Sequence, residues 1–215
     1  NRGNGGWPMT VFLTPEGHPF HAGTYFPPEP RYGMPSFRQV MEAVLDTYHK
    51  KRREVERTAR AMTADLSRNV FDALAATPDM LNKDVLDTAA QNLLARADPV
   101  NGGLTRGRPK FPNPVNLEYL LRYHAGTGDE QALQAVVFTL RKMAQGGMYD
   151  QLGGGFHRYS VDEKWLVPHF EKMLYDNAQL ARVYLHAYQI TGDEFLRDVV
   201  EDTLEYVMRE MTAPD

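Results

Sequence analysis

The sequence has no cysteine among its 215 residues. The chain therefore forms no disulfide, offers no thiolate to a zinc ion and has no thiol chemistry of its own. It also has no excess of basic residues, because 24 Lys and Arg side chains stand against 28 Asp and Glu side chains. Domains that bind nucleic acids are usually basic, so this composition predicts no nucleic-acid partner.

Long hydrophobic runs are absent too. No stretch approaches the roughly 18 consecutive apolar residues of a membrane-spanning helix, and the first residues show no signal-peptide pattern. We therefore expect no membrane partner and take the cytoplasm as the compartment, although a chain without cysteine gives no redox clue to it. Hydrophobic residues still make up 42% of the chain and charged residues 24%, which is typical of a globular protein with a real core.

The first 78 residues predict a β-hairpin followed by one long helix. Residues 9–14 and 18–26 have strand character, and Pro15-Glu16-Gly17 between them is a turn signal. Ser36 stands where a helix N-cap is expected, and the helix is predicted to run over about residues 37–74.

The remainder of the chain predicts helices without strands. Residues 75–78 have the composition of a linker, and a helix is predicted near residues 79–97. Thr127-Gly128-Asp129-Glu130 recurs as Thr191-Gly192-Asp193-Glu194. In this tetrapeptide the glycine can end one helix and the aspartate can cap the next, so the repeat predicts an array of helical hairpins. We read five helices in this part and expect the array to continue beyond residue 215.

The densest chemistry lies in residues 147–177. This segment carries six aromatic side chains and five carboxylates, and long loops of such content are usually functional. Aromatic faces can stack on a sugar ring while charged groups hydrogen-bond its hydroxyls, and paired carboxylates are the means of glycoside hydrolysis. A His–carboxylate pair can also transfer a proton. The segment therefore predicts a site for a sugar ligand.

Other interpretations of the same segment remain open. Its aromatic residues can instead plug the end of a helical barrel, and His169 with Glu171 can be a structural pair. His157 and His169 lie 12 residues apart, which is not a metal-binding spacing, so we predict no metal and no cofactor. Gly153-Gly154-Gly155 lacks the lysine of a phosphate loop and is better explained as a close-packed turn.

Two sets of residues resemble a known family. Residues 5–15 together with residues 23–27 resemble the second half of a thioredoxin-like domain. Lys110-Phe111-Pro112 and residues 149–177 resemble the second part of the same family. That family comprises the bacterial YyaL proteins and their animal relatives, the spermatogenesis-associated protein 20 group. The resemblance covers nearly the whole chain.

The resemblance implies an α+β fragment followed by an all-α region. Residues 1–76 would be the C-terminal half of a thioredoxin-like fold, with Pro8 at the place of its structural cis-proline. Residues 77–215 would be the first helical hairpins of an (α/α)6 barrel, similar to six-hairpin glycosidases and N-acylglucosamine 2-epimerases. The family's cysteine motif would lie before Asn1 and much of the barrel after Asp215, so we expect the chain to be an internal fragment.

Our first hypothesis is a carbohydrate-active or carbohydrate-binding barrel domain attached to a thioredoxin-like domain, with an epimerase-like or glycosidase-like reaction left open. Glu171 and Asp176 are the candidate acid and base, although five residues of helix would point them about 140° apart. Asp150 and His169 are alternative catalytic partners. The residues expected to bind ligand oxygens or to stack on the sugar are His157, Arg158, Tyr159 and Trp165.

Two further hypotheses belong to other classes. A redox or protein-folding accessory protein would use cysteines upstream of this chain. A purely structural loop would seal the barrel without catalysis. In each case an open sheet edge and an unclosed helical layer would expose apolar surface, so we also expect this chain to self-associate.

Overall fold

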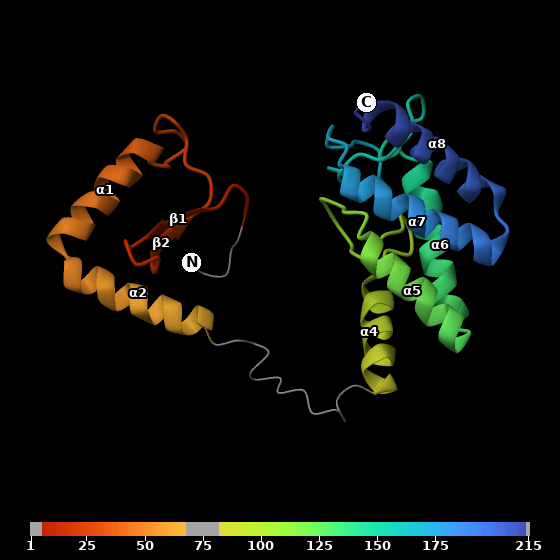
Figure 1. Cartoon of the computed structure of the whole chain (residues 1–215), viewed down its shortest axis with the longest axis horizontal. Coiled ribbons are helices and arrows are strands. Elements are labelled where there is room, and N and C mark those ends of the chain that lie inside the picture. The colour runs from red at the N-terminus through yellow and green to blue at the C-terminus, as the bar shows by residue number, and fades with distance from the viewer. Residues whose placement is uncertain (1–5, 68–81, 214–215) are drawn as a thin grey trace. The chain divides into compact units, whose positions relative to one another are not determined.

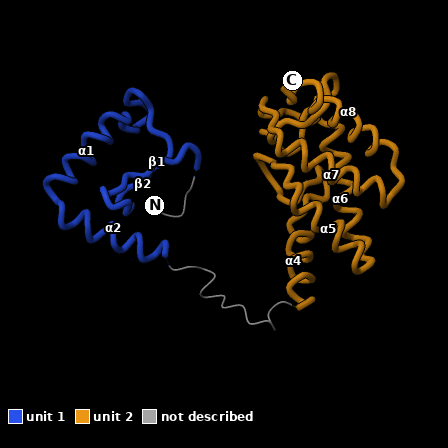
Figure 2. Tube along the Cα trace, viewed as in Figure 1, with its two compact units in different colours: residues 1–78 blue, residues 79–215 orange. Residues whose placement is uncertain are grey.

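The computed structural model describes residues 6–67 and 82–213, which fall into two compact units, Asn1–Pro78 and Asp79–Asp215 (Figure 2). The predicted linker at residues 75–78 and the predicted domain boundary after residue 76 lie outside the described residues. Each unit has its own set of packed elements (Figure 1).

Unit 1 begins with the predicted β-hairpin. Strand β1 (Thr10–Leu13) pairs antiparallel with strand β2 (Pro19–Gly23). The register places Thr10 opposite Gly23 and shifts after Phe12, so that Leu13 lies opposite Pro19. The Trp7–Pro8 peptide bond, just before β1, is cis.

The single long helix predicted after Ser36 is two helices. Helix α1 (Phe37–Lys50) ends at a break at Lys51, and helix α2 (Arg52–Ser67) follows; residues 68–74 lie outside the described part. Ser36 is the N-cap, as expected, and forms a reciprocal capping box with Gln39. The break lies in the basic run that has no apolar side chain, and it turns the two helices so that both border the hairpin (Figure 1).

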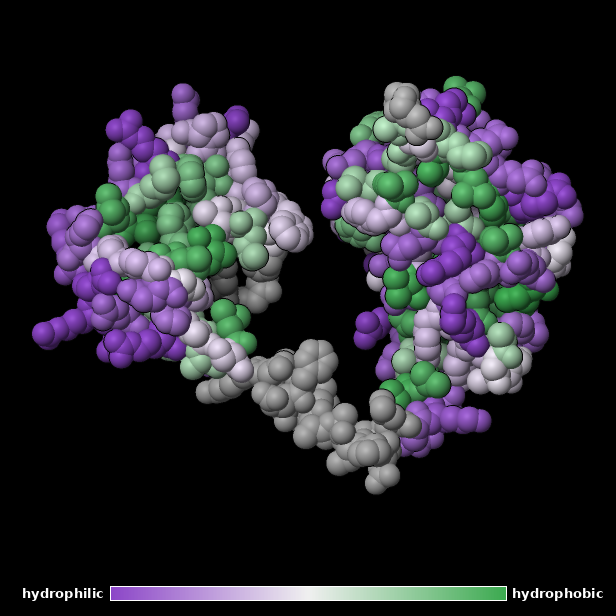
Figure 3. Space-filling model, viewed as in Figure 1, coloured by the Kyte–Doolittle hydropathy of each residue, from purple (hydrophilic) through white to green (hydrophobic). Residues whose placement is uncertain are grey.

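The core of unit 1 is small within the described residues. Its buried hydrophobic side chains are Val40, Val55 and Ala59. Large apolar side chains of the hairpin and the segment before it stay in solvent, and Trp7 is 91% exposed and Met9 62%. Hydrophobic surface is visible in the hollow between the helices and the hairpin (Figure 3). Self-association of the chain stays a prediction that this exposed surface motivates.

Unit 2 consists of helical hairpins, and its described residues contain the five helices that the sequence predicts. Helices α5 and α6 form one hairpin and α7 and α8 the next, with α5 packed beside α7. The helix bounds are α4 (Lys83–Arg96), α5 (Pro114–Thr127), α6 (Glu130–Ala144), α7 (Leu174–Thr191) and α8 (Glu194–Glu210). None of the described helices combines the length and the apolar character needed to cross a bilayer.

The core of unit 2 lies between these hairpins. Leu117, Leu140 and Val183 are completely buried within it, as is Tyr184, whose hydroxyl donates to the Leu140 carbonyl over 2.7 Å. The two parts of the chain thus differ as the sequence indicates: an α+β start with thioredoxin-like character is followed by all-α structure.

The recurring Thr-Gly-Asp-Glu tetrapeptide forms the corner of each hairpin. Gly128 and Gly192 end α5 and α7 with φ of +76° and +68°. The next residue, Asp129 or Asp193, caps the following helix by accepting a backbone N–H. The identical chemistry of both corners confirms the predicted helix–turn–helix repeat.

Candidate functional site

The long connection between α6 and α7 is held by short backbone pairings rather than by regular elements. Ser160 is completely buried and pairs with both Lys110 and Pro168, while Tyr149 pairs with Phe156. The amide of Asn177, at the start of α7, accepts the Phe156 N–H over 2.6 Å and donates to the Phe156 carbonyl over 3.0 Å. These contacts fix the position of the candidate site residues at one end of unit 2.

Four of the predicted site residues come together on the surface of this connection. Arg158 Nη1 donates to Glu171 Oε2 over 2.9 Å, and His169 Nε2 lies 3.6 Å from the same oxygen. The ring of Tyr159 stacks on His169 with centroids 4.6 Å apart and an interplanar angle of 5°. All three charged or titratable side chains keep about 40–48% of their surface exposed. We call Arg158, Tyr159, His169 and Glu171 the Arg158 cluster.

An aromatic face extends this cluster. Phe111, from the Lys110-Phe111-Pro112 motif, lies with its ring centroid 4.8 Å from that of Tyr159. Phe111 is 44% exposed. Phe111, Tyr159 and His169 therefore form a row of aromatic rings beside a carboxylate and a guanidinium.

Asp176 is the fifth member of this neighbourhood. It lies in the first turn of α7, is 8% exposed, and receives no hydrogen bond from any residue in the described ranges. Burial raises the pKa of its carboxyl, Arg158 lowers it and Glu171 raises it again, with a net upward shift. A raised pKa makes a carboxyl better suited to donating a proton.

The expected helical relation between Glu171 and Asp176 is wrong. Helix α7 begins at Leu174, so Glu171 lies in the extended segment before it. The 140° separation on a shared helix therefore does not apply. Both carboxylates instead interact electrostatically with the same cation, Arg158.

Asp150 is placed in a separate group and does not join the Arg158 cluster. Its carboxylate accepts from Lys172 Nζ over 2.8 Å and from the backbone N–H groups of Leu152 and Gly153. Lys172 and these N–H groups hold the pKa of Asp150 well below its usual range. Such a carboxylate stays ionised and closes the glycine-rich turn, so its position is that of a structural group.

His157 lies next to this Asp150–Lys172 pair. Its Nδ1 is buried and has no hydrogen-bond partner within the described part of the chain. Burial and the positive charge of Lys172 lower its pKa, whereas Asp150 raises it. The imidazole packs edge-on against Phe170, with ring centroids 5.3 Å apart.

Trp165 does not line an open site. It is completely buried, and its indole N–H donates to the Asn101 carbonyl over 2.9 Å. Lys110, also completely buried, lies 5.5 Å from its ring centroid and pairs with Asp98 over 2.6 Å. The expectation that this indole stacks on a sugar is corrected, because no face of it is accessible.

Comparison with known proteins shows which proteins the chain is similar to. Residues 1–67 match the thioredoxin-like DsbH family, described as a protein of unknown function, DUF255. The chain is 42% identical to rat spermatogenesis-associated protein 20 over 97% of its length, and 43% identical to the mouse protein over 97%. An uncharacterized protein of Caenorhabditis elegans is 34% identical over 96% of the chain.

Over nearly its whole length the chain is therefore similar to spermatogenesis-associated protein 20. It spans 27% of the length of the rat and mouse proteins and 28% of that of the Caenorhabditis elegans protein. Its first part is thioredoxin-like, as residues 5–15 and 23–27 indicate.

One charged group of unit 2 carries no signal in the sequence. Glu118 of α5 is 6% exposed, and its carboxylate accepts from Arg122 Nε over 2.7 Å and from His186 Nδ1 over 2.8 Å. Burial would raise the pKa of Glu118, but the hydrogen bonds from Arg122 and His186 outweigh it and lower the pKa. Glu118 and His186 are 68 residues apart, and no local spacing links them.

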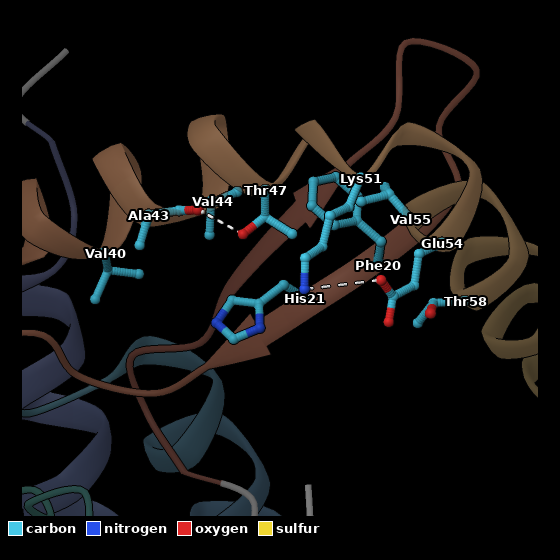
Figure 4. A pocket seen from close by; sticks show the side chains of 10 residues that line it. All are labelled: Phe20, His21, Val40, Ala43, Val44, Thr47, Lys51, Glu54, Val55 and Thr58. Atoms are coloured by element: carbon cyan, nitrogen blue, oxygen red, sulfur yellow. Dashed lines mark hydrogen bonds and ion pairs between the residues drawn. The ribbon is translucent and has the colours of Figure 1, made fainter. Parts of the chain in front are cut away.

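A second feature that the sequence does not indicate lies in unit 1. A cavity of about 380 Å³ separates Phe20 and His21 of β2 from side chains of α1 and α2, among them Val44 and Val55 (Figure 4). At its edge Lys51 and Glu54 form a loose ion pair of 3.9 Å. The lining combines apolar side chains with three titratable ones, His21, Lys51 and Glu54. Within the described residues of both units, no three His, Asp or Glu side chains are grouped as a metal site requires.

Proposed function

We propose that unit 2 is a carbohydrate-binding domain whose site is the Arg158 cluster with Asp176, and that it acts on its sugar by proton transfer. The observation that carries this proposal is the buried Asp176 carboxyl, which has a raised pKa and lies beside an exposed Arg158–Glu171 pair. Aromatic surface next to charged hydrogen-bonding groups suits a ring with an apolar face and hydroxyl edges.

The roles follow from the surroundings of each group. Arg158 donates to sugar oxygens and Glu171 accepts from sugar hydroxyls, because both are half-exposed and already aligned. Tyr159, backed by His169, supplies the stacking face. Asp176, in its neutral form, donates a proton to a sugar oxygen and becomes the carboxylate, which Arg158 stabilises.

The proposal is tested by equilibrium binding and turnover with a panel of mono- and oligosaccharides, in this chain and in a full-length family member. Glu171→Gln is expected to weaken sugar binding about tenfold, since it removes a charged hydrogen-bond partner. Asp176→Asn is expected to keep binding and abolish turnover. Glu163→Gln, an exposed site on the same connection, is the matched control and should change neither.

Sugar binding and turnover that are the same in Glu171→Gln, Asp176→Asn and the parent chain would overturn the assignment. The remaining interpretation would then be a connection that only stabilises the end of the helical unit.

A second candidate function is favoured by the match of residues 1–67 to the thioredoxin-like family. We propose that a full-length member acts as a redox or protein-folding accessory protein, with cysteines that the present chain lacks. Reduction of insulin disulfides by a full-length member, lost when its cysteines are replaced by serine, supports this function. Equal rates with and without the cysteines exclude it.

A further inference from the structure

The Glu118–Arg122–His186 group lines a cavity between α5 and α7 that the proposed sugar site does not use. The cavity has a volume of about 230 Å³. The three charged or titratable side chains line it together with Leu121, Ala125, Gln189 and Ile190. Its lining therefore combines charged or titratable groups with apolar side chains.

The hydrogen bonds within the group leave nitrogen atoms available. Glu118 uses one carboxylate oxygen for Arg122 Nε and the other for His186 Nδ1. Among the described residues, none accepts from the terminal nitrogens of Arg122 or bonds to Nε2 of His186. The side chains of Arg122 and His186 are 72% and 33% exposed, so both can meet a ligand.

The free end of the Arg122 guanidinium suits an anionic ligand. Glu118 uses only Nε of Arg122, and a guanidinium presents its terminal N–H groups in a planar fork that matches a carboxylate. Glu118 itself is fully bonded and does not need to move.

We propose that this cavity binds a small carboxylate with an apolar body, held by the terminal N–H groups of Arg122 and in contact with Leu121 and Ile190. The size of the ligand follows from the volume, which is below the roughly 300–1,000 Å³ of pockets for drug-sized molecules. A single guanidinium and an apolar floor fit a monocarboxylate better than a phosphate, which usually receives several cations or a helix N-terminus.

The test is calorimetric titration of the 215-residue chain with butyrate, with butyramide and inorganic phosphate as probes that lack the charge or the apolar body. Butyrate is expected to bind at least tenfold more tightly than either. Arg122→Gln is expected to weaken butyrate binding at least tenfold. Arg182→Gln, an exposed arginine of α7 outside the cavity, is the matched control and should bind butyrate like the parent chain.

Three results would overturn the proposal: no butyrate binding, equal binding of butyramide, or equal losses in Arg122→Gln and Arg182→Gln. Arg122 is largely exposed, so its replacement should leave the fold intact, which far-UV circular dichroism checks. If His186→Gln lowers stability while Arg122→Gln leaves butyrate binding unchanged, the group is a clamp between α5 and α7 and the proposal fails. The outcome is independent of sugar binding at the Arg158 cluster.

Discussion

Asp150 and Asp176 are carboxylates of the same end of unit 2, yet their surroundings move their pKa values in opposite directions. Lys172 and backbone N–H groups surround Asp150 and lower its pKa. Asp176 is buried without a hydrogen bond from any residue of the described ranges, and its pKa rises. Buried groups that lack a partner reduce stability, and such groups are concentrated at functional sites.

We predict that Asp176→Asn stabilises the chain at pH 7, by on the order of 1 kcal/mol. Because the folded pKa is raised, the folded state holds the proton more tightly than the unfolded state. Stability therefore falls as pH rises from the unfolded pKa of about 3.9 through the folded pKa. Urea denaturation at several pH values measures this. The gain should vanish below about pH 3.9, where both states are protonated, and Asp150→Asn should instead destabilise at pH 7.

At the scale of elements, the two hairpin corners are built in the same way: a glycine ends the first helix and an aspartate caps the next. Nothing lies within 4 Å of a Cβ built on Gly128 or Gly192, so steric contact does not require glycine there. The positive φ at both positions requires glycine, because a residue with a side chain in the left-handed region costs about 1–2 kcal/mol. The glycine is thus needed to end the helix in the space before the aspartate cap.

We predict that Gly128→Ala and Gly192→Ala each lower the free energy of unfolding by about 1 kcal/mol. Gly126→Ala is the matched comparison, since Gly126 lies inside α5 with equally open space around its Cβ. It should stabilise by about 0.5–1 kcal/mol. Urea midpoints at constant m-value give all three numbers, and a loss of stability in Gly126→Ala would contradict the conformational explanation.

The same local chemistry explains how much the sequence could predict. The hairpin, the Ser36 cap and both Thr-Gly-Asp corners follow from residues close together in the chain, and all are present. The break at Lys51 was missed, because a run of charged residues continues a helix as readily as it interrupts one. The change of direction at Lys51 depends on the packing of α1 and α2 against the hairpin. This packing is a tertiary interaction.

The candidate site shows the limit of prediction more sharply. Both Tyr159 and Trp165 are aromatic residues of the same connection, but the tyrosine is half-buried whereas the indole is completely buried in the core. The sequence predicts only that Arg158, His169 and Glu171 lie in one segment. It does not predict that their side chains converge. Glu118 and His186 meet only because α5 packs against α7, a contact that no local pattern encodes.

At the scale of the whole molecule, the two units have unequal cores. The contiguous buried cluster lies entirely in unit 2, whereas the described residues of unit 1 bury few apolar side chains. Stability scales with apolar burial. The chain is therefore not expected to unfold in a single two-state transition.

We predict that unit 1 unfolds at lower urea concentration than unit 2. Trp165 is completely buried in unit 2, and Trp7 is nearly fully exposed, so the fluorescence change on unfolding reports unit 2. The helical circular dichroism signal, which reports both units, should begin to fall before the fluorescence does. Trp7→Phe is the control and should leave the fluorescence midpoint unchanged. Coincident curves from the two signals would show one cooperative unit instead.

The acylation rate of Lys110 reports how often the helical unit opens. Its amine is bonded to Asp98 and to the Gly102 carbonyl, each over 2.6 Å, and is completely buried beneath Trp165. An acylating reagent reacts with the free, deprotonated amine of an exposed lysine and has no route to this one. The rate at which Lys110 becomes acylated, set against that of a surface lysine such as Lys164, thus counts how often this part of the protein opens.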